Sequence, residues 1–391
     1  MQKGYVFRAG SFWFLRYRDA FLVDGKIVRK QKCVKLAQYG DRYRRESDLA
    51  DLVEEKLAGV RAASKCAKSC EPFSHYVSNT YLPFVLANMK PSTYAAYSTY
   101  WKRYIKPRVG KYALRDFTVA IVAGLLKDVA RAHKLNKATV TKIRSVLSGI
   151  FSFAISEGDF PARSKADNPA PGARIPETAS DPKPTHSAKR EEVSAILAAL
   201  KAQPKLKLEE MPLERAAVAI VAMLGTRPGE ARGLKWEDWD RANQQISIER
   251  AVWHKHEGSP KTLQSVRFVA VSAELREILL AFWNEQKCPL GGYILKGPKG
   301  RPVILDNLAK RSIRDRLEKV NQENETDWSW PGWYSLRRFH GTAVRAKSNL
   351  ETTSKALGNS KAVADRHYVK PLEVLPDVRK AVNDSMSGLV Q

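Results

Sequence analysis

A segment without hydrophobic periodicity, from Phe160 to Pro184, interrupts the chain and is rich in Pro, Ser, Ala and Asp. This composition favours an extended linker, because Pro restricts the backbone and no apolar face is available for packing. The regions on its two sides carry apolar residues at helix and strand spacings. With 391 residues in total, the sequence therefore predicts several folded domains, each with its own core.

Four regions are expected along the chain. Residues 1–70 form a small α+β module, residues 71–160 a helical domain, residues 161–186 the linker and residues 187–391 a third domain that includes a C-terminal tail.

The first region has the pattern of a short sheet packed on one helix. Strands are expected around Phe12–Tyr17 and Gln31–Leu36, joined through a turn at Asp24-Gly25, and a helix is expected over Glu46–Ala63. Basic residues follow the strands, which is typical either of a solvated strand face or of a surface that binds a second DNA segment. These residues are Arg16, Arg18, Lys26, Arg29, Lys30 and Lys32.

The second region reads as all-helical. Ser92 is the expected cap of a helix that carries an aromatic face, and two amphipathic helices are expected over Val119–Ala132 and Thr139–Ile155. Basic residues cluster around the start of the last helix, where backbone N–H groups also attract phosphate. The predicted DNA contacts are Lys134, Lys137, Lys142 and Arg144.

The charge balance indicates the partner. The formal net charge is +26, and 43% of the residues are apolar, so the chain is not a disordered polycation. A folded and strongly basic protein is expected to bind nucleic acid, because neutralised phosphates release counterions. An anionic membrane surface is the alternative, although no run reaches the ~18 apolar residues of a membrane span. Residues 1–8 carry no secretory signal, and four cysteines fit a reducing cytoplasm.

Other chemistries have weaker signals. The glycine-rich stretch from Gly292 to Lys299 has Pro298 where a phosphate-binding loop needs Lys. Cys66 and Cys70 lack further zinc ligands nearby, and His254 with His256 would need a third ligand to hold a metal. The sequence therefore predicts neither a metal site nor a cofactor site.

The third domain carries charged residues at the ends of predicted elements. An apolar helix ends at Leu224, breaks at Gly225 and restarts after Pro228, so Arg227 lies at a helix N-terminus, where anions bind. Two predicted strands, Gln245–Val252 and Ser265–Val271, flank a turn that contains Lys261-Thr262. A later helix opens with Tyr334-Ser335-Leu336-Arg337-Arg338, and the segments Leu357-Gly358-Asn359-Ser360 and Arg366-His367-Tyr368-Val369 follow.

In this order, the segments resemble the motifs of the tyrosine recombinase, or phage integrase, family. Arg227 and Glu230 match the Gly-x-Arg-x-x-Glu box, and Lys261 matches the lysine of the Lys-Thr hairpin. Arg337 matches the arginine of the His-x-x-Arg box. Tyr368 lies 368 − 359 = 9 residues after Asn359, which is the family's distance from its Leu-Gly-His box to the nucleophilic tyrosine.

Two positions depart from the family pattern. Tyr334 stands in place of the first histidine and Asn359 in place of the second. Both side chains can donate a hydrogen bond to a phosphate oxygen, but neither exchanges protons near neutral pH as histidine does. His340, one helical turn beyond Arg337, is a candidate substitute, and an inactive DNA-binding protein stays open as an alternative.

The resemblance implies a multidomain, mainly α fold. It comprises an arm-binding-like N-terminal α+β module, a helical core-binding domain and a mixed α+β catalytic domain. It also implies a site-specific DNA recombinase of a phage or other mobile element that works through a 3′-phosphotyrosine intermediate without metal or ATP. Arg227 and Arg337 would clamp the phosphate, Lys261 would act as general acid and Glu230 would orient its neighbours. Arg338 and Arg232 are expected to be contacts to the DNA phosphate backbone or surface charges rather than members of the clamp.

The family also implies an assembly, namely a homotetramer on two duplexes, in some cases with accessory DNA-bending proteins. Residues 371–391 would then dock on a neighbouring protomer. Two alternatives beside the inactive DNA-binding protein are a type IB topoisomerase-like enzyme that relaxes DNA and a basic peripheral membrane protein.

Overall fold

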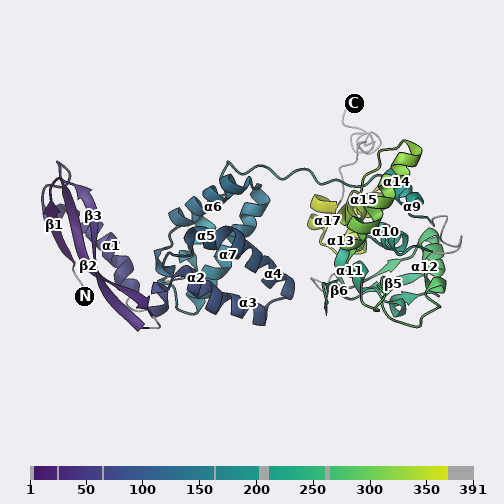
Figure 1. Cartoon of the computed structure of the whole chain (residues 1–391), viewed down its shortest axis with the longest axis horizontal. Helices are drawn as coiled ribbons and strands as arrows, with labels where there is room; N and C mark the ends of the chain where they lie inside the picture. The colour runs from purple at the N-terminus through teal and green to yellow at the C-terminus, as the bar shows by residue number, and fades with distance from the viewer. Residues whose placement is uncertain are drawn as a thin grey trace, which may run out of the picture. The chain divides into compact units, whose positions relative to one another are not determined.

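The computed structural model describes residues 4–23, 26–63, 66–162, 164–201, 211–259 and 265–368. The chain divides into two compact units, Met1–Lys183 and Pro184–Gln391 (Figure 1). The described residues are mainly helical with small sheets, so the predicted fold class, multidomain and mainly α with α+β parts, is confirmed.

The first unit begins with an antiparallel sheet in the order β1-β2-β3. Its elements are β1 (Tyr5–Ala9), β2 (Phe12–Val23), β3 (Lys26–Gln38), η1 (Glu46–Leu49) and α1 (Ala50–Ala63). One sheet face packs on the helix through Val6, Leu15, Leu49 and Leu57. The predicted pairing of the long strands is confirmed up to the pair formed by residues 23 and 26, while the turn residues Asp24-Gly25 lie outside the described residues.

A buried ion pair joins this sheet to the helices of the same unit. The Asp19 carboxylate of β2 accepts hydrogen bonds from Arg115 Nη2 at 2.6 Å and from Lys32 Nζ at 2.9 Å. The Asp19 and Arg115 side chains are 4% and 6% exposed. Because a buried carboxylate is stable only when it is paired, this contact fixes the sheet against η5 (Leu114–Asp116).

The rest of the first unit is a helical bundle. Its other elements are η2 (Ala67–Cys70), α2 (Phe73–Tyr76), η3 (Val77–Tyr81), α3 (Leu82–Asn88), α4 (Pro91–Tyr100), η4 (Trp101–Ile105), α5 (Lys106–Val109), α6 (Val119–His133), α7 (Lys137–Ser156), η6 (Lys165–Asp167) and α8 (Pro169–Gly172). Ser92 is not the cap of α4, because Pro91 already occupies its first turn and Lys90 precedes it.

Two features of this bundle differ from the sequence-based expectation. Part of the predicted linker is packed, since Ala170, Ala173 and Ala179 are buried in the bundle core. Helix α7 is long and apolar enough to cross a membrane by length and composition alone. Seven of its residues, among them Val140 and Phe151, are nevertheless buried in the same core.

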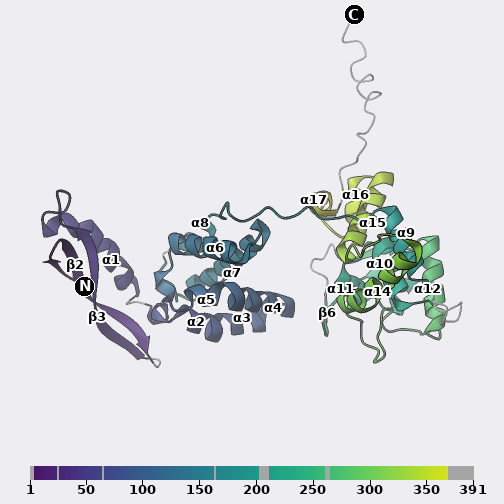
Figure 2. The same ribbon diagram turned by 45° about the horizontal axis from the view of Figure 1, so that its top comes forward.

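The second unit surrounds the apolar helix α10 (Leu213–Leu224), which contacts both α12 and α15. Figure 2 shows these three helices together in the second unit, which also contains a small sheet of order β4-β5-β8. The other elements are α9 (Arg190–Ala199), α11 (Pro228–Gly233), η7 (Trp236–Asp238), β4 (Trp239–Asp240), β5 (Gln245–Ile248), β6 (Ala251–Trp253), β7 (His256–Gly258), β8 (Arg267–Ala270), α12 (Ala273–Glu285), α13 (Leu305–Leu308), η9 (Ala309–Ile313), α14 (Arg314–Asn324), α15 (Trp333–Lys347), α16 (Leu350–Leu357) and α17 (Lys361–Tyr368).

The strands of this unit follow the expected antiparallel pairing only in part. β5 pairs with β8 as predicted. The predicted strand Gln245–Val252 is broken, however, because β6 leaves the sheet and pairs with β7 in a separate hairpin.

Candidate active site

The site begins where α10 ends. Gly225 ends this helix with φ +63°, a left-handed conformation that favours glycine. A Cβ atom at this position would collide with the His340 ring. The chain then turns so that Arg227 directly precedes α11, and its backbone N–H donates to the Glu230 carboxylate at 2.9 Å.

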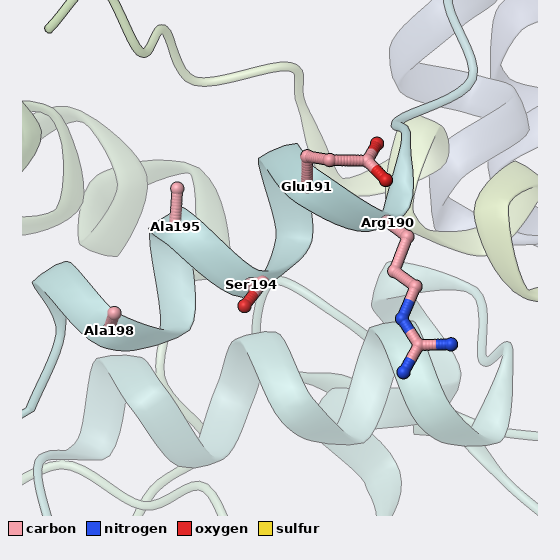
Figure 3. Close-up of a pocket in the computed structure, with 5 residues that line it drawn as sticks. All are labelled: Arg190, Glu191, Ser194, Ala195 and Ala198. Carbon is pink, nitrogen blue, oxygen red and sulfur yellow. The ribbon is translucent and has the colours of Figure 1, made fainter.

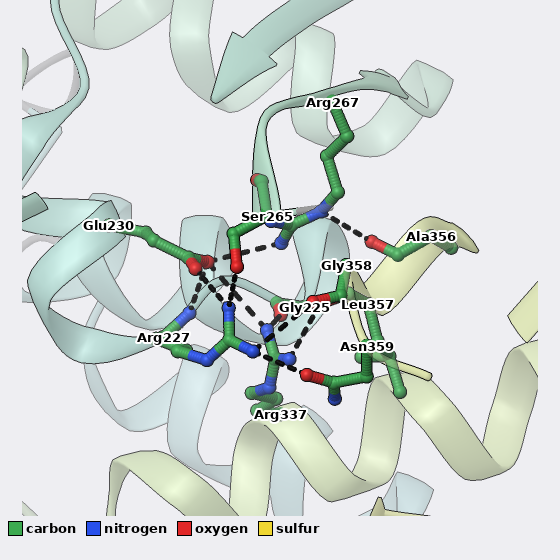
Figure 4. A network of polar contacts seen from close by, with 10 residues as sticks. All are labelled: Gly225, Arg227, Glu230, Ser265, Arg267, Arg337, Ala356, Leu357, Gly358 and Asn359. Atoms are coloured by element: carbon green, nitrogen blue, oxygen red, sulfur yellow. Dashed lines mark hydrogen bonds and ion pairs between the residues drawn. The ribbon is translucent and has the colours of Figure 1, made fainter. Parts of the chain in front are cut away.

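Glu230 is the centre of a cluster of guanidinium groups (Figure 4). Its side chain is 2% exposed and forms ion pairs with Arg227, with Arg267 at 3.1 Å and with Arg337 at 3.7 Å. Burial alone would raise the pKa of this carboxyl, but the three guanidiniums outweigh burial and hold its pKa below the ordinary value. One carboxylate facing three cations leaves a net positive charge at the site.

Arg337 on α15 is fully buried. Its Nη2 donates to the Leu357 carbonyl oxygen at 2.6 Å, and its Nη1 donates to the carbonyl oxygen of Gly225. Burial, and then the nearby Arg227, lower the pKa of Arg337 to about 10. The group therefore stays a cation at neutral pH, and its orientation is fixed by backbone carbonyls from two segments.

Arg227 reaches across the site from α11 to the α16 end. It donates to Ser265 Oγ at 3.3 Å, to the Gly358 carbonyl oxygen at 3.2 Å and to Asn359 Oδ1. Its side chain is 21% exposed, so a ligand can reach this guanidinium from solvent.

Tyr368 lies against Arg337. The Arg337 guanidinium carbon is 4.6 Å from the centroid of the Tyr368 ring, a cation–π distance. The Tyr368 backbone packs on Gly341 of α15, where a Cβ atom would come within 2.9 Å of the Tyr368 carbonyl oxygen. This glycine therefore permits the close approach of α17 to α15.

The two positions that depart from the family pattern are also at this site. Asn359 is bound to Arg227 as described above, and Tyr334 is 48% exposed at the start of α15. Partial burial and the nearby Tyr368 raise the pKa of Tyr334. Because the Tyr334 phenol is protonated at neutral pH, it can donate a hydrogen bond.

His340 is in a different environment from the one its spacing suggests. Its ring packs beneath Gly225, and burial together with Arg337 lowers its pKa to about 4. A histidine with this pKa is neutral and a weak base at neutral pH. These surroundings argue against His340 as the substitute general base.

Two buried N–H donors of the cluster have no hydrogen-bond partner within the described part of the chain. They are Arg337 Nε and Asn359 Nδ2. Unpaired donors are costly when buried, and an anion at this site could satisfy both.

The structure thus brings five of the predicted site residues into one cluster, with Tyr334 beside it; the five are Arg227, Glu230, Arg337, Asn359 and Tyr368. Lys261 and the tail 371–391 lie outside the described residues. Arg338 donates to the carbonyl oxygens of His186 at 2.7 Å and His367 at 3.3 Å.

The predicted DNA contacts of the helical bundle lie in the other unit and differ in availability. Lys134 and Lys142 are exposed. Lys137 pairs with Asp181 at 2.7 Å, and Arg144 donates to the Ala173 carbonyl oxygen at 3.0 Å.

Sequence reasoning missed Arg267 as a member of the site. This buried residue donates to Glu230, to the Ser265 carbonyl oxygen at 2.9 Å and to the Ala356 carbonyl oxygen at 2.7 Å. The signal was its position just after the Lys-Thr segment. Burial lowers the pKa of Arg267, yet three acceptors from three segments hold it in place.

Two other features, a histidine pair and a hollow on α9, have no comparable cluster of charged groups among the described residues. His254 and His256, the pair weighed as metal ligands, both pack on the Trp253 ring at centroid distances of 4.4 and 6.2 Å. A hollow on α9 is lined by residues of that one helix (Figure 3). These residues are Arg190, Glu191, Ser194, Ala195 and Ala198.

This fold, with its mixed α+β second unit, is that of the tyrosine recombinases and integrases, and the resemblance read from the sequence is confirmed. A "Tyrosine recombinase XerC-like" protein of Caldanaerobacter subterraneus subsp. tengcongensis is 23% identical over an alignment of 365 residues, and the match covers 86% of this chain and 86% of the relative. No model of a known protein family matches the chain.

Two solved structures carry the comparison of folds. The Tn1549 transposon integrase in complex with transposon right end DNA has a TM-score of 0.61 and 17% identity, and the match covers 78% of this chain and 98% of that one. A lambda integrase tetramer bound to a Holliday junction has a TM-score of 0.52 and 16% identity, and the match covers 95% and 97%.

Proposed function

We propose that this protein is a site-specific DNA recombinase that cleaves and rejoins DNA through a 3′-phosphotyrosine intermediate. The observation that carries the proposal is the contact of the Tyr368 ring with the Arg337 guanidinium inside a cluster that also holds Arg227. The resemblance to the recombinases and integrases described above supports the same reaction class.

The guanidinium pair supplies the electrostatic part of the mechanism. In-line attack on a phosphodiester places additional negative charge on the non-bridging oxygens. Arg227 and Arg337 would bind these oxygens, since guanidiniums stay charged and donate in a fixed geometry. Fixed donors that face developing charge lower the barrier by about 3–4 kcal/mol each in comparable oxyanion sites. The free Nε of Arg337 and Nδ2 of Asn359 offer two further donors.

The bond changes follow from this arrangement. The Tyr368 oxygen bonds to phosphorus and gives its proton to solvent, while the bond from phosphorus to the 5′-oxygen breaks. Lys261, assigned from the sequence, would protonate the departing 5′-oxygen as general acid. Attack by another 5′-hydroxyl reverses these steps and frees Tyr368. Because one phosphate ester replaces another of similar energy, the exchange needs no ATP.

The substitutions at two motif positions favour one other candidate, a DNA-binding protein without cleavage activity. Tyr334 and Asn359 cannot move a proton near neutral pH as histidine can. In that case the protein would bind its site and form no covalent adduct.

The proposal extends to partners and place of action. Double-stranded DNA is the substrate. The protein would act as a homotetramer that holds two duplexes, and basic residues of both units would bind the DNA. In the first unit these include Lys134 and Lys142. Accessory DNA-bending proteins are further partners in this proposal. A reaction on cellular or phage DNA would take place in the cytoplasm.

A nicked duplex tests the reaction directly. The duplex carries a site that the protein selects from a randomised DNA pool, and the nick lets the cleaved strand end diffuse away. We expect a protein–DNA adduct that survives denaturation and is absent with Tyr368→Phe. Site binding without any adduct would support the inactive DNA-binding protein instead.

A further inference from the structure

Arg338 on α15 joins two segments of the second unit that are far apart in the sequence. Its Nη1 donates to the His186 carbonyl oxygen at 2.7 Å, and its Nε donates to the His367 carbonyl oxygen at 3.3 Å. Residue 186 lies just after Pro184, where this unit begins, and residue 367 directly precedes Tyr368. One guanidinium therefore bridges the start of the unit and the described end of α17.

The His186 side of this bridge is fixed to the body of the unit. Ser335 Oγ, about one helical turn before Arg338, donates to the same His186 carbonyl oxygen at 2.9 Å. The Ala188 N–H donates to the Ser335 carbonyl oxygen at 3.3 Å. Ser335 and Ala188 are 3% and 5% exposed, and Ala188 belongs to the hydrophobic core. Residues 186–188 are thus an anchor that hydrogen bonds and core packing hold on α15.

The His367 side of the bridge holds the backbone next to the proposed nucleophile. The Tyr368 carbonyl oxygen lies close to Gly341, and the Tyr368 ring lies against Arg337. Neither of these contacts is a hydrogen bond to the α17 backbone, which is what Arg338 supplies. Helices α15 and α17 lie side by side in both views (Figures 1 and 2). The bond from Arg338 therefore fixes where α17 presents residue 368 to the guanidinium cluster.

We propose that Arg338 is a positioning residue that holds Tyr368 in place for attack by bonding the preceding carbonyl to a fixed anchor. This inference rests on the proposed function, in which the Tyr368 oxygen attacks phosphorus. It gives Arg338 a different role from the two expected from the sequence, a contact to the DNA phosphate backbone or a surface charge. Arg337 faces the phosphate in this account, and its neighbour Arg338 holds the backbone of the nucleophile.

Arg338→Lys tests this role because it keeps the positive charge and loses the bridge. A lysine has one donor centre and cannot span two carbonyls as the planar guanidinium does. We expect the rate constant of adduct formation at saturating nicked duplex to fall by about tenfold or more, since small displacements from attack geometry are costly. The Kd for the duplex should stay within about twofold, because no phosphate contact is removed.

Three further measurements separate positioning from a general loss of structure. A folding defect lowers the amount of active protein, and hence the amplitude of a single turnover, whereas a displaced nucleophile lowers its rate constant. Hydrogen exchange of the full chain, followed by mass spectrometry, should become faster in residues 361–368 and stay unchanged in α10. In a double variant with Gly341→Ala, the loss of rate should be smaller than the product of the two single losses, because both substitutions displace the same helix.

Arg345→Lys is the matched control, because Arg345 lies on the same helix and donates to the Ser348 carbonyl oxygen at 3.0 Å. It should leave the rate constant, the Kd and the exchange of residues 361–368 unchanged. An unchanged rate constant in Arg338→Lys would overturn the positioning role, whether or not the Kd or the amplitude changes. A slower rate with unchanged exchange in residues 361–368 would overturn it as well. Both results leave the recombinase proposal standing, whereas absence of any Tyr368-dependent adduct in the unsubstituted protein would overturn both.

Discussion

The Arg337 guanidinium carbon lies 4.6 Å from the centroid of the Tyr368 ring in the same chain. Arg337 is buried and fixed by two carbonyl oxygens, whereas Tyr368 ends the last described helix. The contact therefore places the Tyr368 ring beside a cation whose position is set by the core. In the proposed mechanism it holds the nucleophile next to the phosphate clamp.

Replacement of Arg337 should therefore affect cleavage more than DNA binding. We expect Arg337→Lys to lower the rate of adduct formation by about 100-fold or more, equivalent to about 3 kcal/mol. A lysine has one donor centre and cannot bond both carbonyls while it faces the phosphate. Quench-flow rates and a filter-binding Kd measured on the same nicked duplex test this. A rate within about threefold of the original would contradict the clamp role.

Glu230→Gln tests the charge balance of the cluster. The substitution leaves three guanidiniums without their buried counter-ion, so we expect a stability loss of about 3–5 kcal/mol, measured by urea denaturation. Sulfate should restore part of this loss, because an anion that binds only the folded state stabilises it. The control Glu351→Gln removes exposed pairs with Lys355 and Lys361 and should change stability little. Equal effects of the two substitutions would contradict the account.

Gly341→Ala tests the contact that positions Tyr368, the proposed nucleophile. The added methyl group would meet the Tyr368 carbonyl oxygen at 2.9 Å and a Leu357 side-chain carbon at 3.0 Å, so α17 must shift. We expect a loss of adduct formation of at least about tenfold, since small displacements from attack geometry are costly, with unchanged affinity for DNA.

A glycine in another helix provides the control for this substitution. Gly124 lies in α6, and a Cβ atom there would meet no heavy atom within 4 Å. Gly124→Ala should therefore retain full activity and gain up to about 1 kcal/mol in stability. Full activity of Gly341→Ala would show that Tyr368 does not depend on this contact.

His340 should make stability depend on pH. Its pKa is about 4 in the folded protein against an ordinary value of 6.5, so between these values the unfolded chain binds the proton more tightly. Stability should therefore fall as the pH drops from about 6.5 to about 4, by about 3 kcal/mol in total. His340→Gln should flatten this part of the profile of unfolding free energy against pH. An identical slope in both proteins would contradict the burial of a neutral ring.

The order of the motifs was sufficient to predict most of the guanidinium cluster around Glu230. The sequence marks the ends of several helices, and residues at those ends carry the site. Gly225 and Pro228 placed Arg227 before a helix in the sequence, and the structure places it there. The role of Arg267 was not predictable in this way, since two of its three acceptors, Glu230 and the Ala356 carbonyl oxygen, are distant in the sequence. Arg232 was expected to contact the DNA phosphate backbone or to be a surface charge, yet it is buried. Its burial was not predictable, because only tertiary packing reveals which backbone carbonyls need a donor.

Local patterns were least informative where tertiary contacts compete with them. The segment after Phe160 has no periodicity, but its small alanines fill gaps in the helical core. The strand from Gln245 looked continuous, but β6 pairs with β7 rather than with the sheet. Ser92 is a good cap residue by type, but Pro91 starts the helix one residue earlier.

Identification of the residue that becomes attached to DNA tests the central claim most directly, because a second phenol, Tyr334, lies at the same site. The trapped adduct is digested with protease and nuclease, and the modified peptide is sequenced by mass spectrometry. We predict a nucleotide on Tyr368, loss of the adduct with Tyr368→Phe and its retention with Tyr334→Phe. A nucleotide on Tyr334 or on any other residue would contradict the account.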